Sequence, residues 1–353
     1  MKLNRIAQLG AVAAIAALTL TACASNEPAP AATDDATDVA TTLSGELAGA
    51  GSSAQDVAVQ AWAAGFQTIN GETTITYDPA GSGAGRESFQ AGAVGFAGSD
   101  RAFKTDELTE GPFSACVEGT DIIEIPSYIS PIAVIFKLDG IDTLNMDPAI
   151  AATNEGVTLP DLAITPVHRA DDSGTTENFT DYLYQAAPDV WTWEPDGVWP
   201  ETTVAGEAAP QTSGVVAAVE GGTGTIGYAD ASRAEGFGQV AVQIGDEFVA
   251  FSPEAAAAVV DASPLEEGRT AGDLAIELDR TPDSAAYPIV LVSYMIACEE
   301  YTDTAIAPLV KGFLEYVISA EGQDAAAAAA GSAPISDTQR ENMQAALDLI
   351  VTQ

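Results

Sequence analysis

Runs of residues typical of buried strands alternate with longer stretches typical of helices over most of this chain. The strand-like runs are rich in β-branched and aromatic residues and are bounded by Gly, Pro or Asp. They cover 73–78, 93–98, 121–127, 130–138, 224–230 and 287–297. The helical stretches cover 55–69, 178–187, 307–319, 338–350 and the alanine run 325–330. This alternation predicts an α/β fold in which helices cover a sheet.

The first 43 residues have the composition of an export signal followed by a tether. Residues 1–22 contain a short basic start and an apolar run, which predicts a secretory signal peptide too short to be a spanning helix. The stretch LTAC resembles the lipobox of bacterial lipoproteins, in which the cysteine, here Cys23, is acylated and becomes the mature N-terminus. The alternative is an ordinary signal peptide with an incidental cysteine. Residues 23–43 are then a lipidated N-terminus and a disordered tether rich in Ala, Pro, Thr and Asp.

The charge of the chain is strongly negative. Cleavage after residue 22 removes Lys2 and Arg5 and leaves 10 basic and 52 acidic residues, a net charge of −42. A surface this acidic repels a polyphosphate backbone, so we exclude nucleic acid as a partner. In an oxidising compartment, Cys116 and Cys298 are expected to form one disulfide, provided that their Cα atoms lie close enough. Neither cysteine has the spacing of a metal site, so we expect no metal and no cofactor.

The roughly 310 residues after the tether exceed the size at which one hydrophobic core usually keeps growing, so two lobes are expected. Two glycine-rich stretches, 49–54 and 222–227, fit the template of a dinucleotide-binding turn. Both signals are weak, because the second stretch leads into a strand and nicotinamide cofactors are scarce outside the cytoplasm. The physical feature that remains is a glycine-rich turn at the start of a helix, where backbone N–H groups and the helix dipole favour an anion.

Three such turns occur in the chain. Ser52 and Ser53 precede the helix predicted at 55–69, Ser82 begins a short helix, and DSGTTENF places Ser173 and Thr175 at the start of a third. Each hydroxyl taken alone is explained as a helix N-cap. Three Gly-Ser turns, with an arginine four residues before the third, favour a shared anion site.

Five motifs occur here in an order and approximate spacing that are also found in a known family. They are GAGSS, GSGAG, FAGSD, HRADDSGTTENF and TGTIGYAD. In these motifs the chain resembles the phosphate-binding lipoproteins of bacterial ABC importers over residues 45–350. The resemblance implies a type II periplasmic-binding-protein fold with two α/β lobes around a ligand cleft. We expect chain crossings near residues 129 and 290, so that residues 44–129 and 290–353 form lobe I and residues 130–289 form lobe II.

The resemblance also implies a set of phosphate ligands. These are the Ser53 hydroxyl, the Ala54 N–H, the Ser82 hydroxyl and N–H, the Asp100 carboxylate, the Arg169 guanidinium, the Ser173 hydroxyl, and the backbone of Gly174 and Thr175. Many members of the family have an aromatic residue and prolines after the first turn, where this chain has Ala54-Gln55-Asp56. Without the aromatic residue and prolines, this turn is not expected to supply side chains that line the ligand site, but its backbone N–H donor is still expected.

Arginine suits this task because its planar guanidinium binds two phosphate oxygens at once. Asp171 is expected to hold the Arg169 side chain in position, although a surface ion pair is the alternative for Arg169. The alternative for Asp100 is that it merely caps a turn. We expect a structural role for His168, which has no evident catalytic or ligand partner.

The function expected from these features is a binding protein rather than an enzyme. It captures inorganic phosphate and delivers it to the permease subunits of an ABC importer, as a monomer held outside the cell membrane by an N-terminal lipid such as palmitate. Phosphoryl chemistry needs metal ligands, an activated nucleophile or a general base, and the sequence contains one His and no metal-spaced cluster. The alternatives are a secreted phosphatase and a binder of sulfate, molybdate or phosphonate on the same fold.

Overall fold

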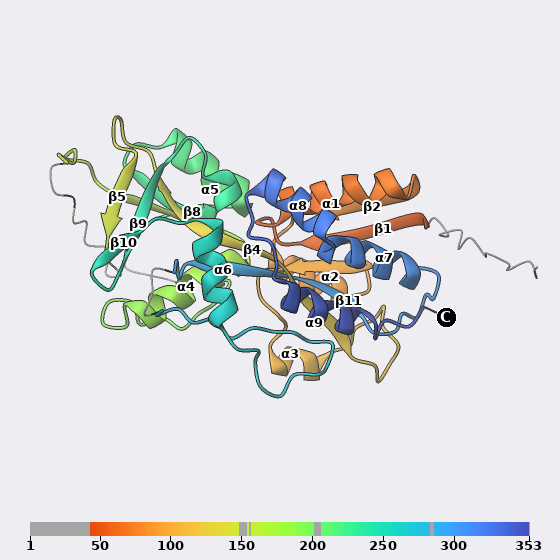
Figure 1. The fold of residues 1–353 in the computed structure, drawn as a ribbon. Coiled ribbons are helices and arrows are strands. Elements are labelled where there is room, and N and C mark those ends of the chain that lie inside the picture. The colour runs from red at the N-terminus through yellow and green to blue at the C-terminus, as the bar shows by residue number, and fades with distance from the viewer. Residues whose placement is uncertain (1–42, 148–153, 155–156, 201–205, 283–285, 353) are drawn as a thin grey trace, which may run out of the picture. The chain divides into compact units, whose positions relative to one another are not determined.

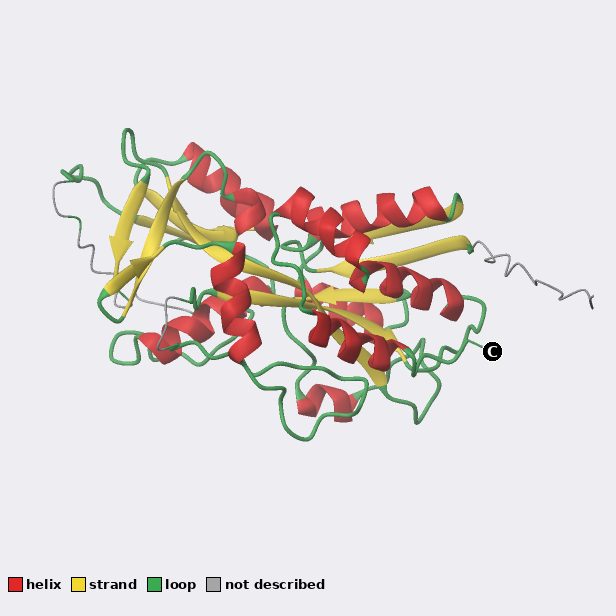
Figure 2. Cartoon of the chain, viewed as in Figure 1, coloured by secondary structure: helices red, strands yellow, loops and turns green. Residues whose placement is uncertain are grey.

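The computed structural model describes residues 43–147, 154, 157–200, 206–282 and 286–352, which belong to one compact unit (Figure 1). The expected signal peptide, the lipidated cysteine and all but the last residue of the tether lie outside the described residues. Figure 2 shows that helices lie against both faces of a long mixed sheet. None of the helices in the described ranges has the length and apolar character needed to cross a membrane.

Eleven strands are assigned within the described part of the chain. Eight of them follow the order β2-β1-β3-β11-β4-β8-β6-β7, and β9 connects β4 to the remaining two, β5 and β10. The strands are β1 (Ser44–Gly51), β2 (Glu72–Asp78), β3 (Phe96–Ser99), β4 (Ile122–Phe136), β5 (Thr143–Met146), β6 (Thr165–Arg169), β7 (Glu207–Ala209), β8 (Thr225–Asp230), β9 (Gly238–Ile244), β10 (Glu247–Val249) and β11 (Val290–Cys298).

The helices connect these strands in the order expected of α/β layering. They are α1 (Asp56–Ile69), α2 (Ser82–Gln90), α3 (Thr105–Glu110), α4 (Gly174–Ala186), α5 (Gln211–Gly221), α6 (Pro253–Ala262), α7 (Ala307–Ile318), α8 (Ala320–Ala330) and α9 (Asp337–Leu347). A short 3-10 helix at Ala231–Arg233 follows β8. The predicted helices at 55–69, 307–319 and 325–330 are confirmed, and the one predicted at 338–350 ends three residues early at Leu347.

Strand β4 corrects one prediction. The runs 121–127 and 130–138 were expected as two strands, but most of both runs belongs to the single strand β4, which is buried along almost all of its length. Pro126 pairs with Tyr294 next to a register shift, and Pro131 pairs with Val290 at the start of β11. The prolines are therefore accommodated at a bulge and at the end of a pairing, where a missing N–H costs little.

β4 also changes its partners along its length. It pairs with β11 from Ile122 to Pro131 and with β8 from Ile132 to Phe136. The strand is thus shared by two parts of the sheet, one built on β1, β2 and β3 and the other on β6, β7 and β8. The change of partner lies close to the predicted crossing near residue 129, and β11 begins at the predicted crossing near 290. The lobe boundaries themselves stay a prediction.

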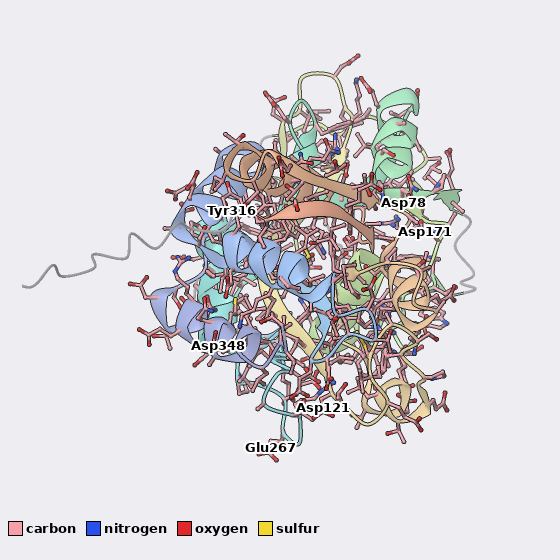
Figure 3. The ribbon with its side chains drawn as sticks, turned by 90° about the vertical axis from the view of Figure 1, so that its right-hand side faces the viewer. Asp78, Asp121, Asp171, Glu267, Tyr316 and Asp348 are labelled. Atoms are coloured by element: carbon pink, nitrogen blue, oxygen red, sulfur yellow. A yellow bond between two sulfur atoms is a disulfide. The ribbon has the colours of Figure 1, made fainter. Side chains whose placement is uncertain are left out.

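Two groups of apolar residues form the core. The larger includes the fully buried rings of Trp62 in α1 and Phe313 in α7, and the smaller packs Val215 and Val219 of α5 against β4, β6 and β8. The Trp62 indole N–H donates to the Gly322 carbonyl at 2.8 Å and thereby links α1 to the start of α8. Acidic side chains such as Asp121, Glu267 and Asp348 are exposed at the periphery (Figure 3), which is where most of the net charge is solvated.

The predicted disulfide is confirmed. Cys116 is bonded to Cys298, the last residue of β11, with a Cα–Cα distance of 5.3 Å. The bond joins residues 182 positions apart in the sequence.

Candidate functional site

The first glycine-rich turn connects β1 to α1. The Ser53 hydroxyl lies 3.0 Å from the Thr212 hydroxyl and accepts a hydrogen bond from the Thr212 N–H at 3.1 Å. Helix α1 has no side-chain cap, so the N-cap interpretation of Ser53 is wrong. The Ala54 N–H, one of the predicted phosphate donors, donates to the Ser52 hydroxyl at 3.1 Å.

A glycine is required where β1 ends. Gly51 has a φ of +146°, and a Cβ added there would lie 1.9 Å from the Gly98 carbonyl oxygen of β3. The absence of a side chain lets the ends of β1 and β3 approach each other. This contact brings the first turn next to Asp100, which follows β3 directly.

The second turn connects β2 to α2. The Ser82 hydroxyl accepts a hydrogen bond from the Asp100 N–H at 3.2 Å, and the side-chain cap that the alternative interpretation required is absent from α2. Gly81 has a φ of +110°, and a Cβ added there would lie 2.6 Å from a carboxylate oxygen of Asp171. The Gly83 N–H donates to the Asp172 carbonyl at 3.2 Å. The second turn therefore packs directly on the segment that precedes the third.

Asp100 lies between the second and third turns. It is 2% exposed, and its carboxylate accepts hydrogen bonds from the Thr175 hydroxyl at 3.1 Å and from the Ser293 hydroxyl. A Cβ added at Gly174 would lie 2.6 Å from the Asp100 Cβ and 2.8 Å from the Ser82 hydroxyl. The structure therefore places predicted ligands of the second and third turns in contact around Asp100, whereas Ser53 of the first turn contacts Thr212 instead.

The Arg169 side chain is held by a carboxylate. Its Nε donates to Asp171 Oδ1 at 2.9 Å and its Nη2 to Asp171 Oδ2, a bidentate ion pair at the end of β6. Asp171, labelled in Figure 3, also accepts from the Gln211 N–H at 2.9 Å. Burial alone would raise the pKa of Asp171, but the hydrogen bonds and charge of Arg169 outweigh it and the pKa is lowered.

The geometry of this ion pair determines which N–H groups of Arg169 are left to bind an oxyanion. Asp171 takes the Nε edge of the guanidinium, which leaves the N–H groups of the Nη1 edge for a ligand. The Arg169 side chain is 2% exposed, so the alternative of a surface ion pair is wrong.

In the third turn, Ser173 caps a helix and also has a hydroxyl that could bind a ligand. Ser173 is fully buried and accepts from the Thr176 N–H at 3.2 Å, so it does cap α4, as the alternative interpretation required. A hydroxyl that accepts in this way still has its own proton to donate. His168 has the structural surroundings expected of it, because its Nδ1 lies 2.9 Å from the Arg169 carbonyl and its ring stacks on Trp199.

Three residues that no sequence motif indicated also contact this site. Arg86 of α2 is 4% exposed and donates to the Ser99 hydroxyl at 2.8 Å, beside Asp100; burial lowers its pKa. Thr212 and Ser293 contact predicted ligands from distant parts of the sequence. The scarcity of basic residues could have drawn attention to Arg86, but nothing in the sequence indicates the other two.

A polar cleft of about 270 Å³ opens beside Asp100. Four of the chain's twelve basic residues line it, namely Arg101, Lys104, Arg269 and Arg280. Each is in an ion pair: Arg101 with Glu177 at 2.7 Å, Lys104 with Glu177 at 3.1 Å, Arg269 with Asp273 at 3.0 Å and Arg280 with Asp181 at 2.7 Å. The positive charge of the cleft is therefore already compensated.

No group of three metal-ligating side chains is found in the described ranges. The chemistry of the three turns is that of hydroxyl, amide and guanidinium donors around one carboxylate. Such a set can hold an oxyanion that keeps a proton for the carboxylate.

Comparison with known proteins identifies relatives along nearly the whole chain. Residues 30–321 match the family described as the PBP superfamily domain. Phosphate-binding protein PstS 3 of Mycobacterium tuberculosis is 30% identical over 378 residues, which cover 99% of this chain and 100% of the relative. Phosphate-binding protein PstS 2 of the same species is 28% identical over 383 residues, with 99% and 100% covered.

Solved structures show the same fold. A high-affinity periplasmic phosphate-binding protein (PfluDING) solved with phosphate has a TM-score of 0.65 at 21% identity, over 85% of this chain and 93% of that chain. The phosphate-binding protein of Stenotrophomonas maltophilia has a TM-score of 0.64 at 17% identity, over 86% and 94%. The predicted α/β periplasmic-binding-protein fold is confirmed.

Proposed function

This chain belongs to the family of PstS-type phosphate-binding proteins, and from this membership we propose that it captures inorganic phosphate for an ABC importer. The family is one of binding proteins and not of enzymes, which removes the secreted phosphatase as an alternative. The observation that carries the proposal is the contact of the second and third turns at Asp100. The Asp100 N–H donates to the Ser82 hydroxyl, the Thr175 hydroxyl donates to the Asp100 carboxylate, Gly174 packs on the Asp100 side chain, and Arg169 ends β6.

We propose the phosphate ligands that the family resemblance implies. They are Ser53, Ala54, Ser82, Asp100, Arg169, Ser173, Gly174 and Thr175, with Asp171 orienting the guanidinium. Support comes from their burial and from the ion pair that fixes Arg169. Because Ser53, Ala54, Ser82 and Asp100 come from the predicted lobe I and the others from lobe II, closing the cleft between the lobes is the step that would satisfy all the donors together.

The protein acts outside the cytoplasm, as the family does, and we propose that lipid on Cys23 anchors it to the outer face of the membrane. The tether of residues 24–43 would hold the folded body on the order of 25 Å from that lipid. The proposed partner is the permease of the importer, and we propose that the binding protein itself is a monomer. Mass spectrometry of the membrane-extracted protein tests the lipid, since unmodified Cys23 would contradict it.

Isothermal titration of the mature protein, stripped of bound ligand, tests the main proposal. We expect tight, one-to-one binding of phosphate and little or no binding of sulfate and molybdate. The same phosphate additions should raise the melting temperature, because a ligand that binds only the folded state stabilises it. Tighter binding of sulfate or molybdate would instead assign the site to another oxyanion.

A further inference from the structure

A second cavity, with a volume of about 370 Å³, lies behind β6 and β8 and is lined mainly by apolar side chains. Aromatic residues form much of its wall: Phe179, Tyr182, Trp191, Trp193, Trp199 and Tyr228. Protein interiors rarely leave a space of this size, because side chains pack at the density of organic crystals. The volume falls in the range of pockets that hold small organic ligands.

The rings of the wall support one another. Trp191 lies 5.0 Å from Trp193 and 5.3 Å from Trp199, and Trp199 stacks on Tyr228 with the ring centres 5.8 Å apart. Aromatic pairs at these separations contribute more stabilisation than the burial of their surface area alone provides. The wall is therefore held by its own contacts.

Two polar atoms of the wall have unused hydrogen-bonding capacity. The Tyr182 hydroxyl and the Trp191 indole N–H are buried, and neither has a hydrogen-bond partner within the described part of the chain. A buried donor without a partner is unfavourable, because it has lost its hydrogen bonds with water and gained none in the protein. Burial also raises the pKa of Tyr182 to about 12, so its hydroxyl keeps its proton at neutral pH. Both atoms can therefore donate to an acceptor inside the cavity.

We propose that this cavity binds a small, uncharged, largely aromatic or aliphatic molecule that carries a hydrogen-bond acceptor such as a carbonyl oxygen. The described lining residues include no lysine or arginine, so a buried anion such as phosphate would have no counter-charge there. A ligand that presents only N–H groups would face two donors, and the indole can act only as a donor. An acceptor on an apolar body satisfies both.

The cavity is distinct from the anion site, although they share a wall. Tyr228 lines the cavity with its ring, while its hydroxyl accepts from the Arg169 N–H at 3.2 Å and lies 2.7 Å from the Thr176 hydroxyl. The inference does not rest on the proposed function, because no phosphate ligand lies among the described lining residues.

The tryptophans provide a direct measurement. The chain has four, and three of them, Trp191, Trp193 and Trp199, line the cavity, whereas Trp62 is a buried residue of α1 and does not line it. A Trp62→Phe background therefore restricts indole emission to the cavity. The probe is 6-propionyl-2-dimethylaminonaphthalene, an uncharged aromatic ketone that absorbs where indoles emit. We expect saturable quenching of the indoles, energy transfer to the probe and a blue shift of the bound probe.

Matched variants locate the bound probe. Tyr182→Phe removes the free hydroxyl and should weaken probe binding about 3- to 10-fold, the range of one lost hydrogen bond, and shift the bound emission further to the blue. Tyr184→Phe on the same helix is the control, because Tyr184 is exposed and lies outside the lining, and it should bind as wild type does. The double variant Val240→Phe/Val242→Phe fills the cavity from β9 and should reduce binding at least 10-fold.

Each outcome decides the inference. Equal affinities in Tyr182→Phe and Tyr184→Phe, or unchanged binding in the filled variant, would overturn it. Tighter binding of the anionic dye 8-anilinonaphthalene-1-sulfonate than of the ketone would overturn the uncharged ligand class. Phosphate titration and thermal unfolding of each variant show whether it is folded. If the filled variant does not fold, the comparison of the two tyrosine variants is sufficient.

Discussion

The hydroxyl oxygens of Ser53 and Thr212 lie 3.0 Å apart although 159 positions separate the two residues in the sequence. Ser53 follows β1, and Thr212 lies in the first turn of α5, so the contact joins the predicted lobe I to the predicted lobe II. Both side chains are buried. A hydrogen bond of this kind forms only while the two parts of the chain are close together, which ties the first predicted ligand turn to α5 of the predicted lobe II.

Thr212→Val keeps the shape of the side chain but removes its hydroxyl. If the contact with Ser53 helps to hold the cleft shut, phosphate affinity should fall about 3- to 10-fold, the range of one lost hydrogen bond. The loss should occur in the dissociation rate, measured by stopped flow with a labelled protein. Ser213→Ala, on the exposed side of the same helix, is the control. Equal dissociation rates in the two variants would show that the contact does not stabilise closure.

Arg169→Lys keeps the positive charge and loses the planar guanidinium. Lysine cannot pair with both oxygens of Asp171 and also present N–H groups to a ligand, so about 1 to 3 kcal/mol of binding should be lost, or roughly 5- to 150-fold in affinity. Titration calorimetry measures the change. Arg233→Lys serves as the control because that side chain is 41% exposed and its pairing with Asp56 spans 3.6 Å. Unchanged affinity in Arg169→Lys would mean that the arginine serves the fold alone.

Asp100→Asn tests the basis of selectivity. Phosphate near neutral pH keeps at least one proton that it can donate to a carboxylate, whereas sulfate has none and would bring like-charge repulsion into a buried site. Exposed charges beyond about 8 Å are largely screened at physiological salt, so the acidic surface does not determine the selectivity between phosphate and sulfate. We expect weaker phosphate binding and a smaller difference between the two anions. Competition of labelled phosphate by sulfate measures this, and an unchanged ratio would exclude Asp100 as the selective group.

Through its contact with Glu107, Arg101 should make part of the free energy of unfolding depend on pH in the acid range. Burial opposes ionisation of Glu107, but hydrogen bonds from Arg101 and the Lys104 N–H lower its pKa to about 2. A carboxyl whose folded pKa is depressed stabilises the fold above its unfolded pKa, near 4.5, and that contribution is lost as the pH falls towards 2.

Arg101→Gln should therefore flatten the fall in urea-unfolding free energy between about pH 4.5 and pH 2. It also removes the ion pair with Glu177, so the variant should be less stable at neutral pH. Lys311→Gln is the control, because that lysine pairs with an exposed carboxylate, Asp348, at 3.6 Å. Parallel pH profiles in wild type and Arg101→Gln would contradict the assignment.

The sequence pattern predicted those helices and strands whose own residues favour the structure that they adopt in the fold. Helices α1 and α7 have strong apolar faces, and β8 and β11 are bounded by turn residues. Strand β1 was missed because its Ala- and Gly-rich sequence has low β-propensity and is fixed by pairing with β2 and β3. Helix α5 was missed because it contains glycine and has little amphipathic pattern, so burial against the sheet decides its structure.

The site was predictable where its residues are local to a turn. Ser82, Arg169 and Ser173 stand in motifs with a physical reason for each residue type. Thr212 and Ser293 were not predictable, because they meet the turns only through the sheet topology. The same holds for the aromatic cavity, in which residues from α4, β6 and β8 meet although no local pattern relates them.

The bond between Cys116 and Cys298 closes a covalent ring around the whole of the predicted lobe II. A protease that cuts any peptide bond between these cysteines leaves two pieces that stay joined through sulfur. Outside the cytoplasm, where the bond persists, a nicked molecule would migrate as an intact chain until a reductant is added. Exposed loops of this lobe can therefore be cut without release of either piece, and damage of this kind is visible only after reduction.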